Sequence, residues 1–338
     1  MGKVNSNKNE VVKVKKINNN EDKFIDSVLR PNNWNDYVGQ ERIKKNLKVI
    51  IQAAKKRKDM PDHLLFYGPT GLGKTTLAHL VAKEMSSEIK ITTGPALERA
   101  GDLAAIISSL ENGDILFIDE CHRINKNIEE VLYPAMESRK LHLVVGKGLG
   151  ARMISIELPA FTIIAATTRV NMISSPLRSR FGAVFRLDYY NFKEIEEIIR
   201  RSANLIGIKI MPEAISLIAK SSRFTPRLAN RLLKRARDFA EVSGFKEINE
   251  ESVLKTFGLL EIDVLGLEEI DRRLLEIIIK KFRNRPVGLN TLSAAMGEEK
   301  GAIEEVYEPY LIRAGLLQRT PAGRIATEEA YRHLGINL

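Results

Sequence analysis

The sequence has little cysteine and no long hydrophobic run, and both absences exclude classes of protein. Cys121 is the only cysteine in 338 residues, which excludes an intramolecular disulfide framework and a zinc site built from several cysteines. No apolar run reaches the roughly 18 residues that a membrane-spanning helix needs. The N-terminus is rich in Lys and Asn and lacks the apolar stretch of a secretory signal. We therefore expect a cytoplasmic protein with no membrane contact.

The composition that is present is that of a globular protein with a moderate positive charge. Hydrophobic residues make up 44% and charged residues 28%, and the formal net charge is +10. A length of 338 residues suggests two or three domains at roughly 150 residues each. The spread positive charge suits contact with a polyanion, but a solubilising surface explains it equally well. The motifs must therefore decide the function.

Residues 1–191 predict a tail followed by an α/β domain. Residues 1–23 hold six Lys and six Asn and no aromatic residue, a composition typical of a disordered tail. Over residues 24–191, apolar runs typical of buried parallel strands alternate with helical periodicity. The strands are expected at residues 63–67, 115–118 and 161–166, and the helices at residues 40–56, 75–85 and 128–138. This alternation indicates a parallel sheet with helices on both faces.

The rest of the chain predicts two smaller domains. Residues 192–262 have helical periodicity over 193–206, 213–221 and 226–242, which indicates an all-helical domain. In residues 263–338, helical stretches at 268–282, 290–296 and 301–314 precede two short strands around a turn at 321–323. Three helices followed by a hairpin is the order of elements in a winged helix.

Residues 68–75, GPTGLGKT, match the phosphate-binding loop G-x-x-x-x-G-K-[ST]. An expected strand precedes the motif and an expected helix follows it, as this loop requires. Glycines let backbone N–H groups surround phosphates, and the helix N-terminus adds positive potential. Lys74 would reach the β- and γ-phosphates, and the Thr75 hydroxyl would bind Mg²⁺. The alternative, a glycine-rich turn before a helix by chance, is disfavoured by both flanking elements.

The apolar run 115–118 ends in two carboxylates, Asp119 and Glu120. Asp119 can hold the Mg²⁺ shell, and Glu120 can act as general base on the attacking water. Two exposed acids at a strand end would be the plain structural alternative. The sequence has no N-K-x-D motif for reading guanine, which argues against a GTPase. Cys121 and His122 follow directly but make a poor metal site, and we expect Cys121 to be a small buried hydrophobe.

Further polar residues fall where a nucleotide site would need them. Thr167 and Thr168 follow the run 161–166 at the carboxyl end of a strand, where open α/β sheets bind ligands. Arg178 and Arg180 lie in an expected loop, and a guanidinium facing a γ-phosphate can accelerate transfer by roughly 10³–10⁵. Either arginine could equally form a surface ion pair. Arg227 lies in the first turn of an expected helix, from which it could face phosphates.

Together these residues resemble one family over nearly the whole chain. The segments are, in order, LRPNNWNDYVGQ, GPTGLGKTT, LFIDECHR, VLYPAMES, AATTR, SPLRSRFG, TPRLANRLL and LQRTPAGR. They are similar to the RuvB family, the AAA+ motors of bacterial Holliday-junction branch migration. The resemblance implies a hexamer that hydrolyses ATP with Mg²⁺ and pulls duplex DNA at four-way junctions through its ring. It also implies a role in recombination and repair, with RuvA and the resolvase RuvC in the same complex.

The resemblance assigns roles to individual residues. Arg180 would be the finger that reaches a neighbouring subunit's ATP, and Thr167 or, preferably, Thr168 would sense the γ-phosphate. In the winged helix, Arg319 and Arg324 would contact DNA phosphates from the exposed tip of the hairpin. Nucleotide contacts would come from Leu29, Arg30, Gly71, Gly73, Lys74, Thr75, Thr76, Glu137, Arg180, Tyr190 and Arg227. Family members usually carry a different triplet where this chain has residues 137–139, and a small residue where it has Phe224.

Residues 141–158 alternate about three glycines, as a hairpin would. Its apolar residues Leu149, Met153 and Ile154 could pack on their own domain or bind a partner. The resemblance implies that they dock on RuvA.

Two other classes of function compete with a DNA motor. An AAA+ initiator or clamp-loader-like switch also pairs a nucleotide core with C-terminal helical or winged-helix domains, but it would turn over ATP slowly. A protein unfoldase would need an aromatic-Gly pore loop after the first acidic strand, and none is present. Tyr37-Val38-Gly39 lies before the phosphate loop and is too early.

Overall fold

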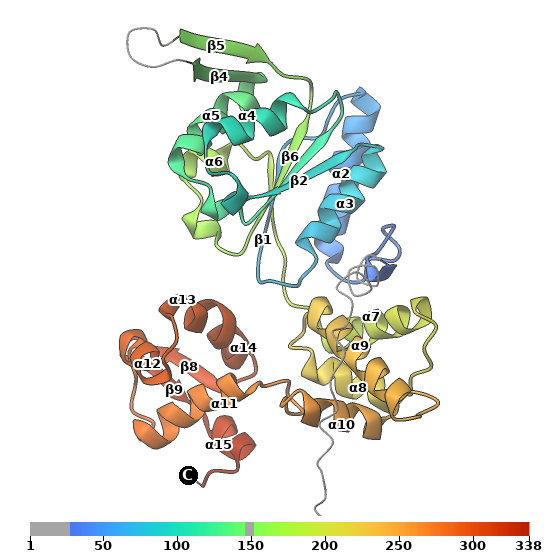
Figure 1. Cartoon of the computed structure of the whole chain (residues 1–338), viewed down its shortest axis with the longest axis vertical. Helices are drawn as coiled ribbons and strands as arrows, with labels where there is room; N and C mark the ends of the chain where they lie inside the picture. Colours follow the sequence, from blue (N-terminus) through green and yellow to red (C-terminus); the bar gives the residue numbers. More distant parts are fainter. Residues whose placement is uncertain (1–27, 146–151, 338) are drawn as a thin grey trace, which may run out of the picture.

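The computed structural model describes residues 28–145 and 152–337. The chain folds into three parts, of which the first is α/β and the other two are mainly helical (Figure 1). The expected tail at 1–23 lies outside the described residues. The first part holds a five-stranded parallel sheet in the order β2-β3-β6-β1-β7. Its strands are β1 (Leu64–Tyr67), β2 (Ile89–Thr93), β3 (Ile115–Asp119), β6 (Thr162–Thr167) and β7 (Ala183–Arg186).

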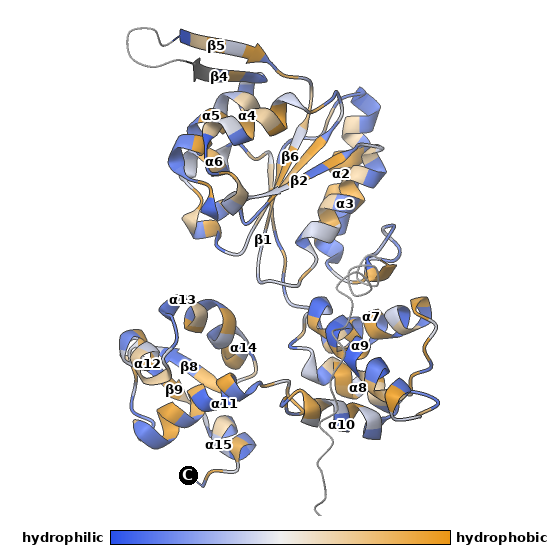
Figure 2. Cartoon of the chain, viewed as in Figure 1, coloured by the Kyte–Doolittle hydropathy of each residue, from blue (hydrophilic) through white to orange (hydrophobic). Residues whose placement is uncertain are grey.

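The three strands predicted from apolar runs are confirmed as the central strands β1, β3 and β6. Their side chains are buried on both faces, as parallel sheets covered by helices require. In β3, Ile115 and Phe117 belong to one buried cluster, while Leu116 and Ile118 belong to another on the opposite face. Figure 2 shows hydrophobic residues along the central strands of the sheet.

Helices cover both faces of this sheet, which confirms the predicted fold class. On one face lie α2 (Glu41–Arg57) and α3 (Lys74–Met85), and on the other α4 (Ala100–Ser108) and α5 (Lys126–Ser138). The hairpin β4 (Lys140–Val145) and β5 (Arg152–Glu157) projects from this part, away from the other two (Figure 1). A short helix, α6 (Ser175–Ser179), precedes β7.

The second part consists of the helices α7 (Phe192–Leu205), α8 (Pro212–Ser221), α9 (Pro226–Val242) and α10 (Glu250–Leu259). Local sequence sets their starts: Asn191 and Glu194 form a capping box on α7, and proline opens α8 and α9. The buried residues of this second part, which we call the lid, are continuous with one core of the first part.

The third part has a buried cluster of its own and the elements of a winged helix. Its helical segments are α11 (Glu269–Glu276), η5 (Ile277–Lys281), α12 (Leu289–Met296), α13 (Lys300–Ala302), η6 (Ile303–Tyr307) and α14 (Glu308–Arg313). The wing strands β8 (Leu317–Thr320) and β9 (Gly323–Ala326) and the helix α15 (Glu328–Leu334) follow. We propose that domains span residues 24–191, 192–262 and 263–338, and the separate core supports the boundary before the third. Within the described residues, no helix is long and apolar enough to cross a membrane.

Candidate nucleotide site and DNA interface

The loop between β1 and α3 has the backbone geometry of an anion site. Gly71 and Gly73 adopt φ values of 78° and 96°, in the left-handed region that favours glycine. A Cβ atom at Gly73 would lie 2.8 Å from the Tyr37 hydroxyl, so a larger residue would also clash there. The helix α3 begins at Lys74 with no side-chain cap. Its first N–H groups and the positive end of its dipole are therefore available to phosphates.

Lys74 is held at this loop by backbone carbonyls. Its side chain is buried at 8% exposure, and its Nζ donates to the oxygens of Gly68 and Pro69 at 2.8 and 2.7 Å. Burial lowers the pKa of Lys74 to about 8, and the nearby Asp119 carboxylate opposes this shift. The ammonium therefore lies beside the loop, where a phosphate would replace the carbonyls as its partner.

Most of the residues assigned to the nucleotide line one cavity of about 430 Å³. It lies where the phosphate loop, the end of β3 and the lid meet. The expected residues that line it are Leu29, Arg30, Gly71, Gly73, Lys74, Thr75, Thr76, Asp119, Glu120, Thr168, Tyr190 and Arg227. Thr75 and Asp119 share this cavity, and a hydroxyl and one carboxylate fit a Mg²⁺ ion that takes its other ligands from phosphate and water.

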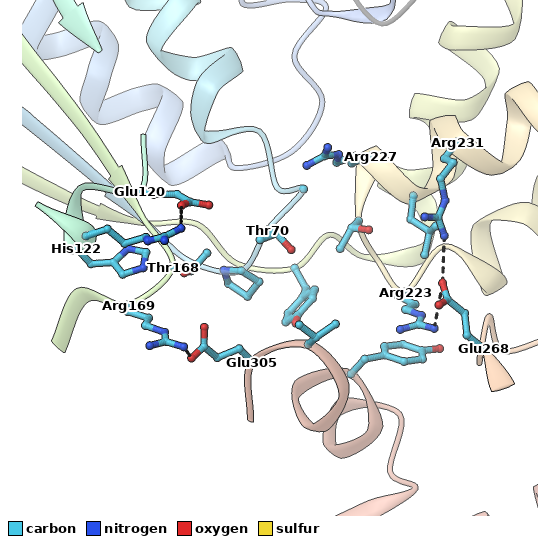
Figure 3. Close-up of a pocket in the computed structure, with 18 of the residues that line it drawn as sticks. Thr70, Glu120, His122, Thr168, Arg169, Arg223, Arg227, Arg231, Glu268 and Glu305 are labelled. Carbon is cyan, nitrogen blue, oxygen red and sulfur yellow. Dashed lines mark hydrogen bonds and ion pairs between the residues drawn. The ribbon is translucent and has the colours of Figure 1, made fainter. Parts of the chain in front are cut away.

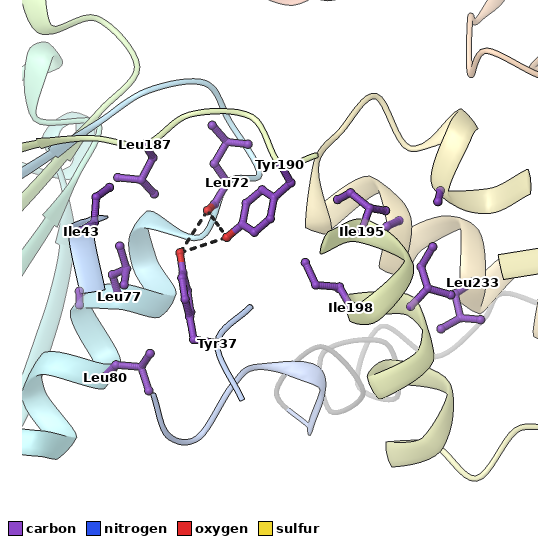
Figure 4. Packing of buried hydrophobic residues seen from close by; sticks show 14 of the residues in the cluster. Tyr37, Ile43, Leu72, Leu77, Leu80, Leu187, Tyr190, Ile195, Ile198 and Leu233 are labelled. Atoms are coloured by element: carbon purple, nitrogen blue, oxygen red, sulfur yellow. Dashed lines mark hydrogen bonds between the residues drawn. The ribbon is translucent and has the colours of Figure 1, made fainter. Parts of the chain in front are cut away.

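Two buried tyrosines connect the phosphate loop to the start of the lid by hydrogen bonds (Figure 4). The Tyr190 hydroxyl lies 3.2 Å from that of Tyr37, and both hydroxyls lie within 3.4 Å of the Leu72 carbonyl oxygen. Burial raises the pKa of Tyr190 to about 12 and that of Tyr37 well above its ordinary value. Both phenols are therefore neutral, and they tie the loop to the linker that leads into α7.

Tyr37 and Arg201 are among the residues that line the cavity and that the sequence did not point to. Arg201 of α7 donates from Nη1 to the Leu29 carbonyl oxygen at 3.0 Å and lies 3.9 Å from the Asp36 carboxylate. It thus holds the segment that begins with Leu29 against the lid. Tyr37 stands inside the quoted segment LRPNNWNDYVGQ, so the resemblance could have pointed to it. Arg201 lies in an ordinary amphipathic helix and has no such signal.

The two acids after β3 differ in environment. Asp119 ends the strand and accepts the N–H of Glu120 at 2.9 Å. Glu120 has left-handed backbone, with φ 50°, and its exposed carboxylate lies 3.2 Å from Nη1 of Arg123. No group of three or more acidic, His or Cys side chains that could hold a metal occurs in the described residues. Cys121 is buried, as expected, and burial raises its pKa to about 12.

The two threonines that are candidate sensors lie in different surroundings at the end of β6. Thr168 lines the nucleotide cavity. Thr167 is buried, and its Oγ1 lies 2.9 Å from Nδ1 of His122 and accepts the N–H of Arg169 at 2.9 Å. Burial, and secondarily the Arg169 charge, lower the pKa of His122. The position of Thr168 therefore favours Thr168 as the residue that faces the nucleotide.

Arg180 and Glu137 lie together and away from this chain's own cavity. The Arg180 guanidinium lies 3.0 Å from the Glu137 carboxylate and 4.2 Å from the centre of the Tyr133 ring. Neither residue lines the nucleotide cavity. Glu137 does not line the cavity of its own chain, because α5 packs on the sheet face opposite α3, and the expected contact of Glu137 with a nucleotide stays a prediction. Arg178 is exposed.

The wing arginines lie on adjacent strands but in different surroundings. Arg319 and Arg324 are register partners in β8 and β9. Arg319 is exposed and lies 3.1 Å from Glu304, whereas Arg324 is 6% exposed and lies 2.5 Å from Glu308. The expectation that both arginines are at the exposed tip is wrong for Arg324. Hydrogen bonding to Glu308 raises the pKa of Arg324 above its ordinary value.

The hairpin β4–β5 presents apolar side chains to solvent. Met153 is 73% exposed and Ile154 is 45% exposed, so these two do not pack on their own domain. Leu149, the third residue expected to bind a partner, lies outside the described residues.

Comparison with known proteins covers all three parts of the chain. Models of the RuvB P-loop domain, the RuvB AAA lid domain and the RuvB C-terminal winged helix domain match residues 29–187, 190–263 and 264–335. Two curated proteins, from Chloroflexus aggregans and Dehalococcoides mccartyi, are named Holliday junction branch migration complex subunit RuvB. Each is 54% identical over 316 residues, or 94% of this chain and 90% of its own.

A solved structure, the Thermotoga maritima RuvB Holliday junction branch migration motor, has a similar architecture. It is 49% identical, with a TM-score of 0.83, and the match covers 92% of this chain and 99% of that one. These comparisons confirm the resemblance seen in the sequence motifs, and the chain belongs to the RuvB family.

Proposed function

We propose that this protein is an ATP-driven motor that moves duplex DNA to drive branch migration of Holliday junctions. The observation that carries the proposal is a single cavity that joins the phosphate loop, the Asp119–Glu120 pair and the lid residue Arg227. Such a cavity lets the state of the nucleotide set the position of the lid. The winged helix, a fold that binds DNA in many proteins, lies beside that lid (Figure 1) and contacts the end of β6 through the Arg169–Glu305 ion pair.

The residues of the cavity divide the chemistry between them. Lys74 and the first N–H groups of α3 bind and orient the phosphates. Thr75 and Asp119 would hold Mg²⁺, which supplies neutralisation of charge on the β- and γ-phosphates. Glu120 accepts a proton from the attacking water, and Thr168 contacts the γ-phosphate side. Arg227 approaches the phosphates from the lid, whereas Leu29, Arg30 and Tyr190 enclose the rest of the nucleotide.

The proposal extends to partners that complete the site. Arg180 faces away from its own cavity, which suits a finger that acts on a neighbouring subunit in a homo-hexameric ring. The exposed Met153 and Ile154 of the hairpin suit docking on RuvA, with RuvC resolvase in the same complex. Arg319 suits contact with DNA phosphates. We place this work in the cytoplasm, in recombination and DNA repair.

Branch migration of a synthetic four-way junction tests the proposal. The protein with ATP, Mg²⁺ and RuvA should displace strands and hydrolyse ATP continuously, faster with DNA than without. No displacement in the presence of RuvA and ATP would overturn the motor assignment. Slow ATP turnover with stable DNA binding and no displacement would favour an initiator or clamp-loader-like switch.

A further inference from the structure

His122 links the turn that carries Glu120 to the strand that carries Thr168. The short helix η2 (Cys121–Arg123) follows Glu120 directly. From it, the His122 ring reaches the end of β6 and lies 2.9 Å, Nδ1 to Oγ1, from Thr167. Figure 3 shows His122 beside Glu120 and Thr168. The bond joins residues that are 45 positions apart in the chain, just beyond the point where the paired strands β3 and β6 end their ladder at Ile118 and Ala165.

The Thr167 hydroxyl extends this link along the backbone on both sides of Thr168. The hydroxyl belongs to the residue before Thr168 and accepts the N–H of Arg169, the residue after it, at 2.9 Å. Thr167 is 1% exposed, so water does not compete for its oxygen. A displacement of Thr168 must therefore disturb this hydroxyl and, through it, the His122 ring.

The turn that carries Glu120 needs such support. The backbone at Glu120 is left-handed, with φ 50°, so the chain leaves the extended path of β3 at this residue. Its exposed carboxylate is paired with Arg123 of the same turn, a contact that moves with the turn. Cys121 packs into the apolar core, whereas His122 bonds to β6.

We propose that His122 is a positioning residue for ATP hydrolysis, which holds Glu120 and Thr168 in a fixed relation through its hydrogen bond to Thr167. This inference rests on the proposed ATPase function. In this role His122 does not touch the attacking water or the γ-phosphate. It transmits the position of the sensor residue to the general base, so that the water is activated only when Thr168 is placed for the γ-phosphate.

A double-mutant cycle on the full chain tests the link. His122→Ala and the isosteric Thr167→Val should each lower kcat for ATP by between about ten- and a hundredfold, as loss of a positioning contact does. Affinity for ADP should change little, because the phosphate loop is untouched. The double variant should be no slower than the slower single variant, since both changes break one bond. His142→Ala, at an exposed position of the hairpin, is the matched control and should leave ATPase unchanged.

Conservative variants separate the hydrogen bond from folding effects. His122→Asn places an amide nitrogen near the position of Nδ1, and Thr167→Ser keeps the hydroxyl, so both should recover most of kcat. If His122→Ala does not fold, the comparison of Thr167→Ser with Thr167→Val carries the test. Additive losses, or a full kcat in Thr167→Val, would overturn the positioning role while leaving the ATPase assignment intact. A wild-type protein without ATPase would overturn both.

Discussion

Arg169 forms an ion pair with Glu305, and this contact ties the end of β6 to the winged-helix part (Figure 3). Arg169 follows Thr168, which lines the nucleotide cavity. A second contact nearby joins the winged-helix part both to the segment before α7 and to the lid. The guanidinium of Arg313 lies 4.7 Å from the ring centre of Tyr189 and 4.9 Å from that of Phe224. The domain that we propose binds DNA is therefore attached next to the residue that we propose senses the nucleotide.

We expect Glu305→Gln to loosen the winged-helix domain without unfolding it. Both side chains are about one-third exposed, so the loss in global stability should stay below about 1 kcal/mol. Limited proteolysis should cut the connection around residues 260–268 several times faster than in the wild type. Glu329→Gln, which breaks an exposed pair with Arg332 inside α15, is the matched control. Equal cleavage rates in the two variants would contradict a role for Glu305 in docking.

Lys74→Ala and Glu120→Gln should separate nucleotide binding from hydrolysis. Removal of the Lys74 ammonium should abolish ATP binding, because the phosphates lose their point charge. Glu120→Gln should keep ATP and Mg²⁺ affinity but lower kcat by about 10²–10⁴, the usual contribution of a general base. Titration with a fluorescent ATP analogue and a steady-state ATPase assay measure the two properties. Equal losses of affinity in both variants would show that the two residues do not divide the work as proposed.

The sequence predicts the centre of the fold better than its edges. Strands β1, β3 and β6 are buried on both faces and read as continuous apolar runs. The edge strand β2 is largely open to solvent, with Ile91 53% exposed, and β7 is also half-exposed. The strand β2 forms no apolar run, and that of β7 is only three residues long, so a search for longer runs passes over both. The helices α4, α10 and α15 also lie outside the expected ranges. In α10 the buried face includes Ser252 and Thr256, so it does not form the apolar stripe by which a helix is found in a sequence.

In the candidate site too, residues in local motifs were predictable from the sequence, whereas residues placed by contacts between distant segments were not. The phosphate loop is a local motif whose sequence specifies its backbone, and it was predictable residue by residue. Arg201 reaches the cavity through packing of the lid on the ATPase part, which no short motif encodes. The burial of Arg324 depends on Glu308, 16 positions earlier in the chain. A count of charges along the sequence cannot show that these two face each other.

Arg180→Ala should produce subunits that bind ATP but do not hydrolyse it. The guanidinium lies outside its own cavity, so its loss should lower kcat by roughly 10³–10⁵ through the neighbouring site. Arg178→Ala, an exposed arginine two residues away, serves as the control. ATPase assays of Arg180→Ala mixed with Lys74→Ala should show partial recovery, where an intact arginine meets an intact phosphate loop. Mixed rings that assemble but stay inactive would make the assignment in trans wrong.

The two wing arginines should give different phenotypes, because one is exposed and the other forms a buried pair. Residues 263–338 carry 11 basic and 12 acidic residues, so any DNA contact must come from local charge. Arg319→Ala should weaken duplex binding equally across sequences and reduce the salt slope by roughly 0.9, as expected for one lost phosphate contact. Basal ATPase without DNA should not change.

Arg324→Ala leaves the Glu308 carboxylate, at 2% exposure, without its partner. Loss of one member of a buried pair costs about 3–5 kcal/mol, so this variant should unfold at lower denaturant concentration. The pair Arg324→Met with Glu308→Leu removes both charges and should recover most of that stability. Denaturant unfolding and a DNA-binding isotherm at several salt concentrations measure the two effects. If Arg324→Ala keeps full stability and loses a salt slope equal to that of Arg319→Ala, Arg324 contacts phosphate directly and the buried pair opens when DNA binds.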